Sequence, residues 1–131
     1  MDAYFSQFPP DFENLGEAFV KAYYEALQTN RAAVVNMYHD SALMSYEGIK
    51  IQGKQNILKH FEGLSWSTIA ITLSTCDYQP VDNGYLIFVN GQLKVDNGDK
   101  ALPFSEFFLL KKVDNAVVIL HSMFRLHLHN S

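Results

Sequence analysis

The sequence lacks the disulfide cross-links that can stabilise a small protein without a large hydrophobic core. Cys76 is the only cysteine among 131 residues, so no disulfide can form within the chain. A single cysteine also favours a reducing compartment. We expect Cys76 to lie in a strand as a small buried hydrophobic side chain.

Long apolar segments are missing as well. No apolar run approaches the roughly 20 residues that span a membrane as a helix. Residues 1–4 begin neither the basic nor the long apolar segment of a signal peptide. We therefore expect a soluble intracellular protein that does not insert into a membrane.

Basic residues and nucleotide-binding motifs are also scarce. Ten Lys and Arg stand against fourteen Asp and Glu, and the net charge of -4 argues against a general nucleic-acid binder. The same charge permits a basic protein partner. No G-x-S-x-G, P-loop or G-x-G-x-x-G motif occurs, so acyl transfer and nucleotide chemistry have no support in the sequence.

The chain does contain enough apolar residues for one folded domain. Hydrophobic residues make up 48% of it, and a chain of this length buries about two-thirds of its unfolded surface. Aromatic residues, at 14%, suit a β-rich protein with a cavity or an aromatic interface. We predict a single domain over residues 1–131, in which residues 1–10 form a loose leader.

Three near-copies of one turn organise the second half of the chain. They are Val81-Asp82-Asn83-Gly84, Val95-Asp96-Asn97-Gly98 and Val113-Asp114-Asn115-Ala116. Asn-Gly is a strong hairpin signal because a type I′ turn needs a positive φ at both central residues. Asn tolerates that conformation, which keeps the third turn plausible without glycine. Residues 68–128 are therefore predicted to form an antiparallel meander of four strands.

The first half of the chain predicts three helices and a hairpin. Apolar spacing predicts an amphipathic helix that starts at Asp11, a good N-cap, and ends near residue 30. A short helix should follow over about 31–38, broken by residues 39–41. Residues 42–52 should form a hairpin, and a third helix should run over 53–62.

The predicted strands are apolar on both faces. One strand places Leu86 and Phe88 opposite a face formed by Tyr85, Ile87, Val89, Gly91, Leu93 and Val95. In the last strand, strict alternation separates two sets, Val118, Leu120, Phe124 and Leu126 on one face, and Val117, Ile119 and Met123 on the other. Three helices can cover only one face of a sheet. We therefore predict a homodimer through the other face, with Phe88 and Met123 at its interface.

Two arrangements raise the possibility of chemistry. His127 and His129 share one side of a strand, but a zinc site needs three or four ligands and the chain has no thiolate cluster. We expect solvated histidines, no metal and no cofactor.

An acid–base site is the other possibility. Tyr38, His39, Asp40 and Tyr46 could reach a pocket between sheet and helices, where a base beside a tyrosine donor could abstract a proton. A polar pair at the end of a helix is more often a cap than a catalytic dyad. We therefore expect no catalytic residues and no enzyme.

Acidic residues gather near two turns. Asp96 and Asp99 flank the middle turn of the meander, and Glu47 lies in the early hairpin. Turns favour Asp in any case. An acidic rim beside Leu93 and Val95 could instead accept a basic protein loop that carries an apolar anchor.

Several sequence blocks occur together in the order and spacing of one family. They are Phe19-x-x-x-Tyr23-Tyr24, Tyr46-Glu47-Gly48 followed by Gln52-Gly53-Lys54, Gly91-Gln92-Leu93, Phe107-Phe108-Leu109-Leu110, and Met123-Phe124-Arg125-Leu126 with His129-Asn130. Over residues 11–130 the chain resembles the nuclear transport factor 2 family.

The resemblance implies an α+β cone, in which three helices wrap a curved antiparallel sheet, and a sheet-to-sheet homodimer. It also implies a carrier for Ran in its GDP form, in which an aromatic side chain of Ran enters an apolar cavity. Carried over to this chain, the cavity residues are Tyr46, Leu64, Ile69, Leu93, Val95, Leu102 and Phe124. The acidic rim that would pair with basic residues of Ran is Glu47, Asp96 and Asp99.

The family also binds Phe-Gly repeats of nuclear pore proteins near the first helix, where Phe12 matches an aromatic position. The chain departs from the family pattern at several sites. Tyr46 stands where Trp is common, Ile71 where a cavity His is usual, and Ser122 where Asp is usual. Phe12 replaces Trp, Gln28 replaces Asp, and the acidic loop that contains Asp99 is one residue longer.

The function implied is nucleocytoplasmic transport of Ran-GDP, in the cytoplasm and nucleus and at the nuclear pore. Two alternatives remain. One is a small-molecule isomerase or dehydratase of the same superfamily, with a polar pocket in the cone. The other is a dimerising or scaffolding domain without Ran activity.

Overall fold

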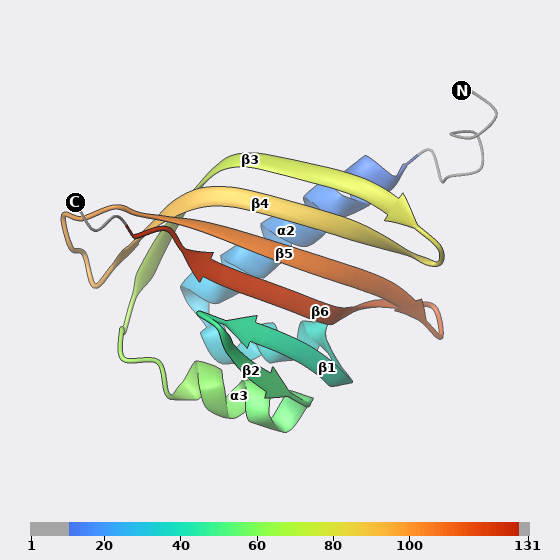
Figure 1. Cartoon of the computed structure of the whole chain (residues 1–131), viewed down its shortest axis with the longest axis horizontal. Helices are drawn as coiled ribbons and strands as arrows, with labels where there is room; N and C mark the ends of the chain where they lie inside the picture. The colour runs from blue at the N-terminus through green and yellow to red at the C-terminus, as the bar shows by residue number, and fades with distance from the viewer. Residues whose placement is uncertain (1–10, 129–131) are drawn as a thin grey trace.

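A six-stranded sheet curves around three helices (Figure 1). The computed structural model describes residues 11–128, and the strands lie in the order β2-β1-β6-β5-β4-β3. The sheet is open, with β2 and β3 at its two edges. Helix α2 crosses behind the long strands, and α3 lies beside β1 and β2 (Figure 1).

The helices follow the predicted spacing closely. Helix α2 spans Phe12–Thr29, the 3₁₀ helix η1 spans Arg31–Met37, and α3 spans Lys54–Glu62. Asp11 occupies the predicted N-cap position of α2, but its side chain makes no capping hydrogen bond. Within residues 11–128 no helix is long and apolar enough to cross a membrane.

The four-stranded meander is confirmed. Its strands are β3 (Ile69–Val81), β4 (Gly84–Val95), β5 (Leu102–Val113) and β6 (Ala116–Leu126). All three turns use residues with positive φ: Asn83 in the first, Asp96 and Asn97 in the second, and Asp114 and Asn115 in the third. The third turn therefore reaches this conformation without glycine, as its Asp-Asn pair predicts.

The predicted sheet was antiparallel throughout, and this is wrong for one pair of strands. Strands β1 (Tyr38–Tyr46) and β2 (Ile49–Gln52) form the expected antiparallel hairpin. Strand β1, however, runs parallel to β6. The chain leaves the hairpin through α3 and enters the meander at the far edge, so β6 returns beside β1 in the same direction. The sheet is therefore mixed.

Strand β1 also starts earlier than predicted. The short helix does end before residues 39–41, but these residues already belong to the strand, which begins at Tyr38 directly after η1. The pairing of β1 with β6 shifts register between Tyr38 and Leu43. This irregularity accommodates the polar residues that resemble a helix end in the sequence.

The last strand contains a second irregularity. The pairing of β5 with β6 passes from Leu110↔Ile119 to Leu109↔His121, so Leu120 is an extra residue. Such a bulge reverses which side chains face inward. Ile119 is therefore fully buried on the inner face, whereas Met123 is 50% exposed on the outer one. The prediction that Ile119 and Met123 share a face is wrong for this reason.

Candidate functional site

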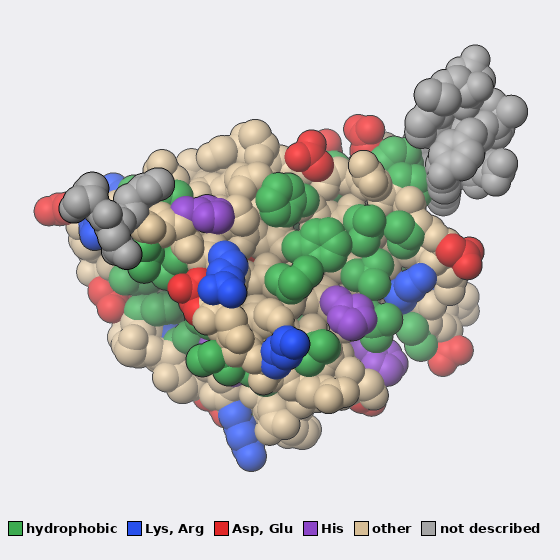
Figure 2. All heavy atoms as spheres, viewed as in Figure 1, with side chains coloured by type: hydrophobic (Ala, Val, Ile, Leu, Met, Phe, Trp, Pro, Cys, Tyr) green, Lys and Arg blue, Asp and Glu red, His purple; other side chains and the backbone are tan. Residues whose placement is uncertain are grey.

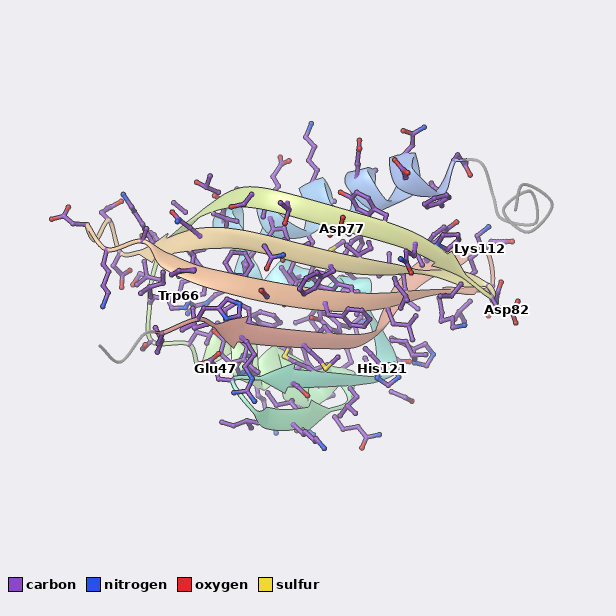
Figure 3. All side chains as sticks on the ribbon, turned by 45° about the horizontal axis from the view of Figure 1, so that its top comes forward. Glu47, Trp66, Asp77, Asp82, Lys112 and His121 are labelled. Atoms are coloured by element: carbon purple, nitrogen blue, oxygen red, sulfur yellow. The ribbon has the colours of Figure 1, made fainter. Side chains whose placement is uncertain are left out.

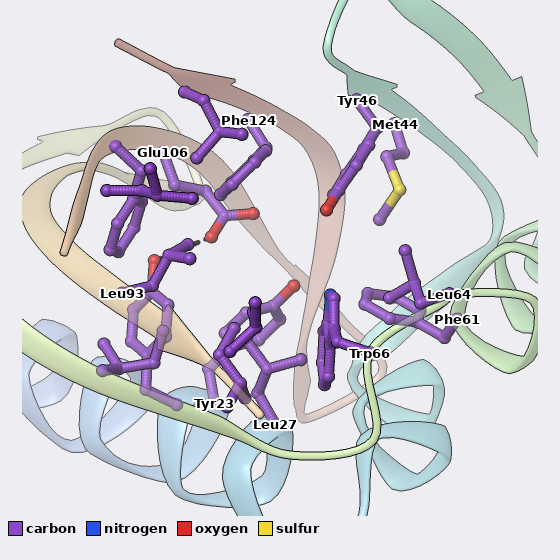
Figure 4. Close-up of a pocket in the computed structure, with 17 residues that line it drawn as sticks. Tyr23, Leu27, Met44, Tyr46, Phe61, Leu64, Trp66, Leu93, Glu106 and Phe124 are labelled. Carbon is purple, nitrogen blue, oxygen red and sulfur yellow. Dashed lines mark hydrogen bonds between the residues drawn. The ribbon is translucent and has the colours of Figure 1, made fainter. Parts of the chain in front are cut away.

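A cavity of about 170 Å³ lies between the inner face of the sheet, α2 and the segment before β3 (Figure 4). Tyr23, Tyr24 and Leu27 from α2 and Phe61 from α3 line it on the helical side. Met44, Phe61 and Phe104 are fully buried deep in it, while Tyr46 and Val95 are half-buried nearer solvent.

The structure brings together all seven residues assigned to the cavity by resemblance. They line this one space and come from β1, the segment after α3, and β3 to β6: Tyr46, Leu64, Ile69, Leu93, Val95, Leu102 and Phe124. Ile71, noted as a departure from the family, also lines it and adds to its apolar character. The assignment of a partner to these residues remains a prediction.

Stacked aromatic rings form one wall. The rings of Tyr46 and Phe124 lie 4.7 Å apart at an interplanar angle of 12°, and Phe104 stacks behind Phe124 at 5.6 Å. His60 packs edge-on against the other side of Tyr46 at 4.3 Å. Burial lowers the pKa of His60 below its ordinary value, so this ring supports Tyr46 as a neutral group.

Two of the three predicted rim acids accept backbone hydrogen bonds. Glu47 has a positive φ in the β1–β2 turn, and its Oε1 accepts the N–H of Leu126 at 2.5 Å. This contact joins the hairpin to the end of β6. Asp99 is exposed beyond the β4–β5 turn. Figure 3 shows Glu47 and Trp66 at one end of the sheet and the Asp82 turn at the other.

Asp96 holds the segment that forms the mouth of the cavity. Its Oδ1 accepts the N–H groups of Ser67 and Thr68 at 2.7 and 3.0 Å. These two bonds keep the pKa of Asp96 below its ordinary value, and Arg31 adds to the effect. Both bonds use the same oxygen, so the other oxygen of this exposed carboxylate can accept from a partner.

Arg31 holds the same segment from the opposite side. Its guanidinium donates to the carbonyl oxygens of Trp66 and, at 3.1 Å, Leu64, and lies 4.6 Å from the centre of the Trp66 ring. A guanidinium over an indole is attracted to the face of the ring. Arg31 and Asp96 together fix residues 64–68, which place Leu64 and Trp66 in the cavity wall.

One charged residue lines the cavity, and the sequence-based assignment missed it. Glu106 is 5% exposed, and Tyr24 Oη donates to its Oε1 at 2.8 Å. Burial raises the pKa of Glu106 to about 8, and the bond from Tyr24 only partly offsets this. Alternation along β5 could have revealed it, because Phe104, Glu106 and Phe108 all face inward. Trp66 was also missed, since it lies in a segment without periodic pattern.

The residues considered for acid–base chemistry do not converge. Tyr38 is buried in a separate chain of hydrogen bonds, 3.1 Å from Tyr23 Oη and 3.0 Å from Ser122 Oγ. His39 Nδ1 accepts the N–H of Ser41, and Asp40 is exposed. Of the four residues proposed for that site, Tyr46 alone lines the cavity.

Metal ligands do not cluster in the described part of the chain, where no group of three His, Cys, Asp or Glu side chains could hold an ion. His127 Nε2 instead lies 2.6 Å from Ser105 Oγ. His129 lies outside the described residues, as do residues 1–10.

The other predicted surface residues lie outside the cavity. Phe12 is half-buried at the start of α2 and packs against the core. Phe88 and Met123 are 42% and 50% exposed on the outer face of the sheet. Figure 2 shows this face, where hydrophobic side chains gather around the central strands.

Comparison with known proteins finds similar sequences and a similar fold. The family model for the nuclear transport factor 2 (NTF2) domain matches residues 15–126. Nuclear transport factor 2B of Arabidopsis thaliana is 34% identical over 125 residues, which cover 93% of this chain and 98% of that protein. Probable nuclear transport factor 2 of Caenorhabditis elegans is 32% identical, with 95% and 98% covered. The solved structure of nuclear transport factor 2 from Cryptosporidium parvum superposes with a TM-score of 0.86 at 32% identity, over 92% of this chain and 98% of that one.

Proposed function

Because the chain belongs to the nuclear transport factor 2 family, we propose that it is a nucleocytoplasmic transport factor that binds Ran-GDP and carries it into the nucleus. In this role it is a carrier and not an enzyme. It acts in the cytoplasm and nucleus and at the nuclear pore. The observation that carries the proposal is the aromatic-lined cavity, which combines all seven residues expected to receive the partner's side chain.

The cavity suits one aromatic anchor. A volume of about 170 Å³ resembles the apolar cavity of about 150 Å³ that holds a benzene molecule in another protein. Burying one aromatic side chain there contributes on the order of 1.5–3 kcal/mol. Aromatic side chains such as Tyr46, Phe104 and Phe124 line the cavity, and aromatic pairs in offset or edge-to-face arrangements favour a ring over an aliphatic side chain.

Acidic groups beside the mouth would select and orient a basic partner. Glu47, Asp96 and Asp99 lie on the turns that follow β1 and β4. Charge complementarity of this kind raises the association rate and excludes wrong partners more than it adds affinity. Glu47 is the sharpest test because it lies directly after the cavity residue Tyr46.

Replacement of Glu47 by Lys should weaken Ran-GDP binding at least tenfold in titration calorimetry. The change reverses the charge at the rim and removes the acceptor for Leu126 N–H. Glu47→Gln is the matched control, because it keeps an acceptor and removes only the charge. If both variants bind Ran-GDP as tightly as the unchanged chain, the rim assignment is wrong.

Binding of Phe-Gly repeats is the second half of the proposal. Phe12 lies on α2, and Gln28 near its other end bonds to Tyr24 O and Ile71 N. A pull-down with Ran-GDP, Ran-GTP and a Phe-Gly repeat fragment tests both halves. Retention of Ran-GDP and repeats, with little Ran-GTP, is the expected result. Loss of repeat binding in Phe12→Ala, with Ran-GDP binding kept, would assign the repeats to this helix.

The proposed carrier is a homodimer through the outer face of the sheet. Strand register places Phe88, Phe107 and Met123 side by side across β4, β5 and β6, with Leu86, Leu109 and His121 in the adjacent row. An exposed apolar row of this kind on a soluble domain is typical of an interface. A second copy supplies the same row and can form a closed pair.

A small-molecule enzyme of the same superfamily is the second candidate, and Glu106 is the observation that favours it. A single buried carboxyl in an apolar cone could take part in proton transfer. Its raised pKa leaves it largely protonated at neutral pH, which suits an acid better than a base. Co-purification of a metabolite that is lost in Glu106→Leu, together with turnover of that metabolite, would support the enzyme.

A further inference from the structure

The protein supplies a hydrogen bond to only one of the two oxygens of the Glu106 carboxyl. Tyr24 donates to Oε1, and within residues 11–128 the structure shows no hydrogen bond to Oε2. His60 Nε2 is the one fully enclosed side-chain polar atom without a partner in that range, so Oε2 must retain open space beside it. Figure 4 shows the carboxyl pointing into the cavity, toward the hydroxyl of Tyr46 on the opposite wall.

The surroundings of this carboxyl favour its neutral form. Among the described residues no lysine or arginine lines the cavity, so a carboxylate there would lack a counter-charge. Burial raises the pKa of the three tyrosine hydroxyls that line the cavity with Glu106, and of Tyr38, which bonds to Tyr23, so these groups stay neutral at pH 9: Tyr23, Tyr24, Tyr38 and Tyr46. Since Oε1 already accepts from Tyr24, the acid proton resides on Oε2. A neutral carboxyl in an apolar site is a hydrogen-bond donor.

The remaining space fits one ring. Aromatic side chains such as Tyr46 and Phe124 line it, and aliphatic side chains such as Leu93 and Ile71 enclose it. A purely hydrocarbon ring would fill the cavity but leave the Glu106 donor unpaired, which is unfavourable for a buried polar group.

We propose that the cavity is also a binding site for an uncharged single-ring small molecule whose one polar atom is an oxygen that accepts a hydrogen bond from Glu106. This inference does not depend on Ran binding. Such a molecule would occupy the volume that the proposed aromatic anchor of a protein partner needs, so the two would exclude each other.

Two ring compounds of equal size test the proposal. Anisole carries an ether oxygen, and ethylbenzene replaces that oxygen with a methylene group. Titration of each compound at pH 6, followed by the fluorescence of Trp66, reports occupancy directly because this is the only tryptophan and it lines the cavity. The quantity of interest is the ratio of the two affinities, since ethylbenzene is the more hydrophobic compound.

Variants at Glu106 isolate the hydrogen bond. In Glu106→Met the affinity ratio should shift about threefold to tenfold toward ethylbenzene, the range expected for one neutral hydrogen bond. Glu106→Gln should keep most of the preference for anisole, because its amide N–H can donate while its oxygen accepts from Tyr24. An unchanged ratio in Glu106→Met overturns the proposal, as does failure of the unchanged chain to bind either compound.

A pH arm keeps the test decisive if Glu106→Met does not fold. In the unchanged chain, ionisation of Glu106 removes the donor, so the preference for anisole should fall between pH 6 and pH 9. In Glu106→Gln the preference should stay constant over the same range. Equal pH dependence in the two chains would overturn the assignment of the donor.

Discussion

Glu106 places an ionisable group among aromatic rings, so its protonation is linked to folding. Burial raises its pKa from an ordinary value of 4.5 to about 8. Between these values the folded chain holds a proton that the unfolded chain has released. Stability therefore falls as pH rises through this window, by at most about 1.4 kcal/mol per pH unit, and levels off above about pH 8.

Glu106→Gln should remove this dependence, because Gln does not titrate and still accepts from Tyr24. We expect the urea midpoint of the unchanged chain to fall relative to that of Glu106→Gln between pH 5 and pH 8. His60 titrates in both chains and cancels in the comparison, and Asp96 titrates below the window. A constant difference between the two midpoints would contradict the buried, protonated state of Glu106.

Asp96 illustrates how one acid can serve two roles that mutations can separate. Asp96→Ala removes the acceptor for Ser67 and Thr68, so the amide hydrogens of these residues should exchange faster and Trp66 fluorescence should shift to longer wavelength. Asp96→Asn keeps the acceptor and loses only the charge, so it should preserve both signals. If Asp96→Ala leaves exchange at these amides unchanged, the segment is held by Arg31 alone.

Sequence reasoning located cavity residues well but not their polar partner. Resemblance supplied the seven apolar and aromatic positions, which the structure gathers in one space. Alternation along β5 places Glu106 on the inner face with Phe104 and Phe108, but an acidic residue in a strand is usually exposed, so its type argues against burial. The contacts of Asp96 with residues 67 and 68 join segments far apart in the sequence, so no local pattern reports them.

At the scale of elements, curvature of the sheet depends on a bulge in β3 opposite Gly91. Pairing shifts between Leu73 and Thr75, and Gly91 on β4 lies between the backbone of β3 and the Phe104 ring of β5. A Cβ atom at this position would lie 2.5 Å from the carbonyl oxygen of Thr72 and 3.2 Å from the ring of Phe104. The missing side chain at Gly91 therefore lets the strands bend at this bulge, next to the cavity residue Phe104.

Gly91→Val should destabilise the fold by about 1–3 kcal/mol, because the added side chain must displace backbone on one side and a buried ring on the other. Urea denaturation measures the change. Val89→Ile, two residues earlier on the same face, is a control that enlarges a buried side chain without touching the bulge. Gly91→Val with unchanged stability would show that β3 can move away freely.

Local chemistry explains which elements were predictable. The three turns require positive φ, and their Asn and Asp residues adopt it readily. Short stretches of sequence are therefore enough to predict the meander. The parallel β1–β6 pairing and the bulge at Leu120 depend on contacts between distant segments. A strict two-residue alternation assigned Ile119 to the wrong face of the sheet, because it does not allow for the extra residue in a bulge.

At the scale of the whole molecule, the exposed apolar rows on the outer face predict self-association. Met123→Glu should place a carboxylate in the proposed dimer interface, and light scattering should then show monomers. Ile49→Glu is the matched control, because Ile49 is 65% exposed on β2, away from these rows. A Met123→Glu chain that remains dimeric would place the interface elsewhere.

The parallel pairing of β1 with β6 also constrains the order of folding. Tyr46 pairs with Phe124, so one wall of the cavity joins two segments separated by most of the chain. Loops of this length close slowly, and contacts between distant segments slow folding in general. During synthesis the meander can pair its own strands early, but the aromatic wall cannot assemble until β6 has left the ribosome. A nascent chain that stops before β6 would therefore lack this wall of the cavity.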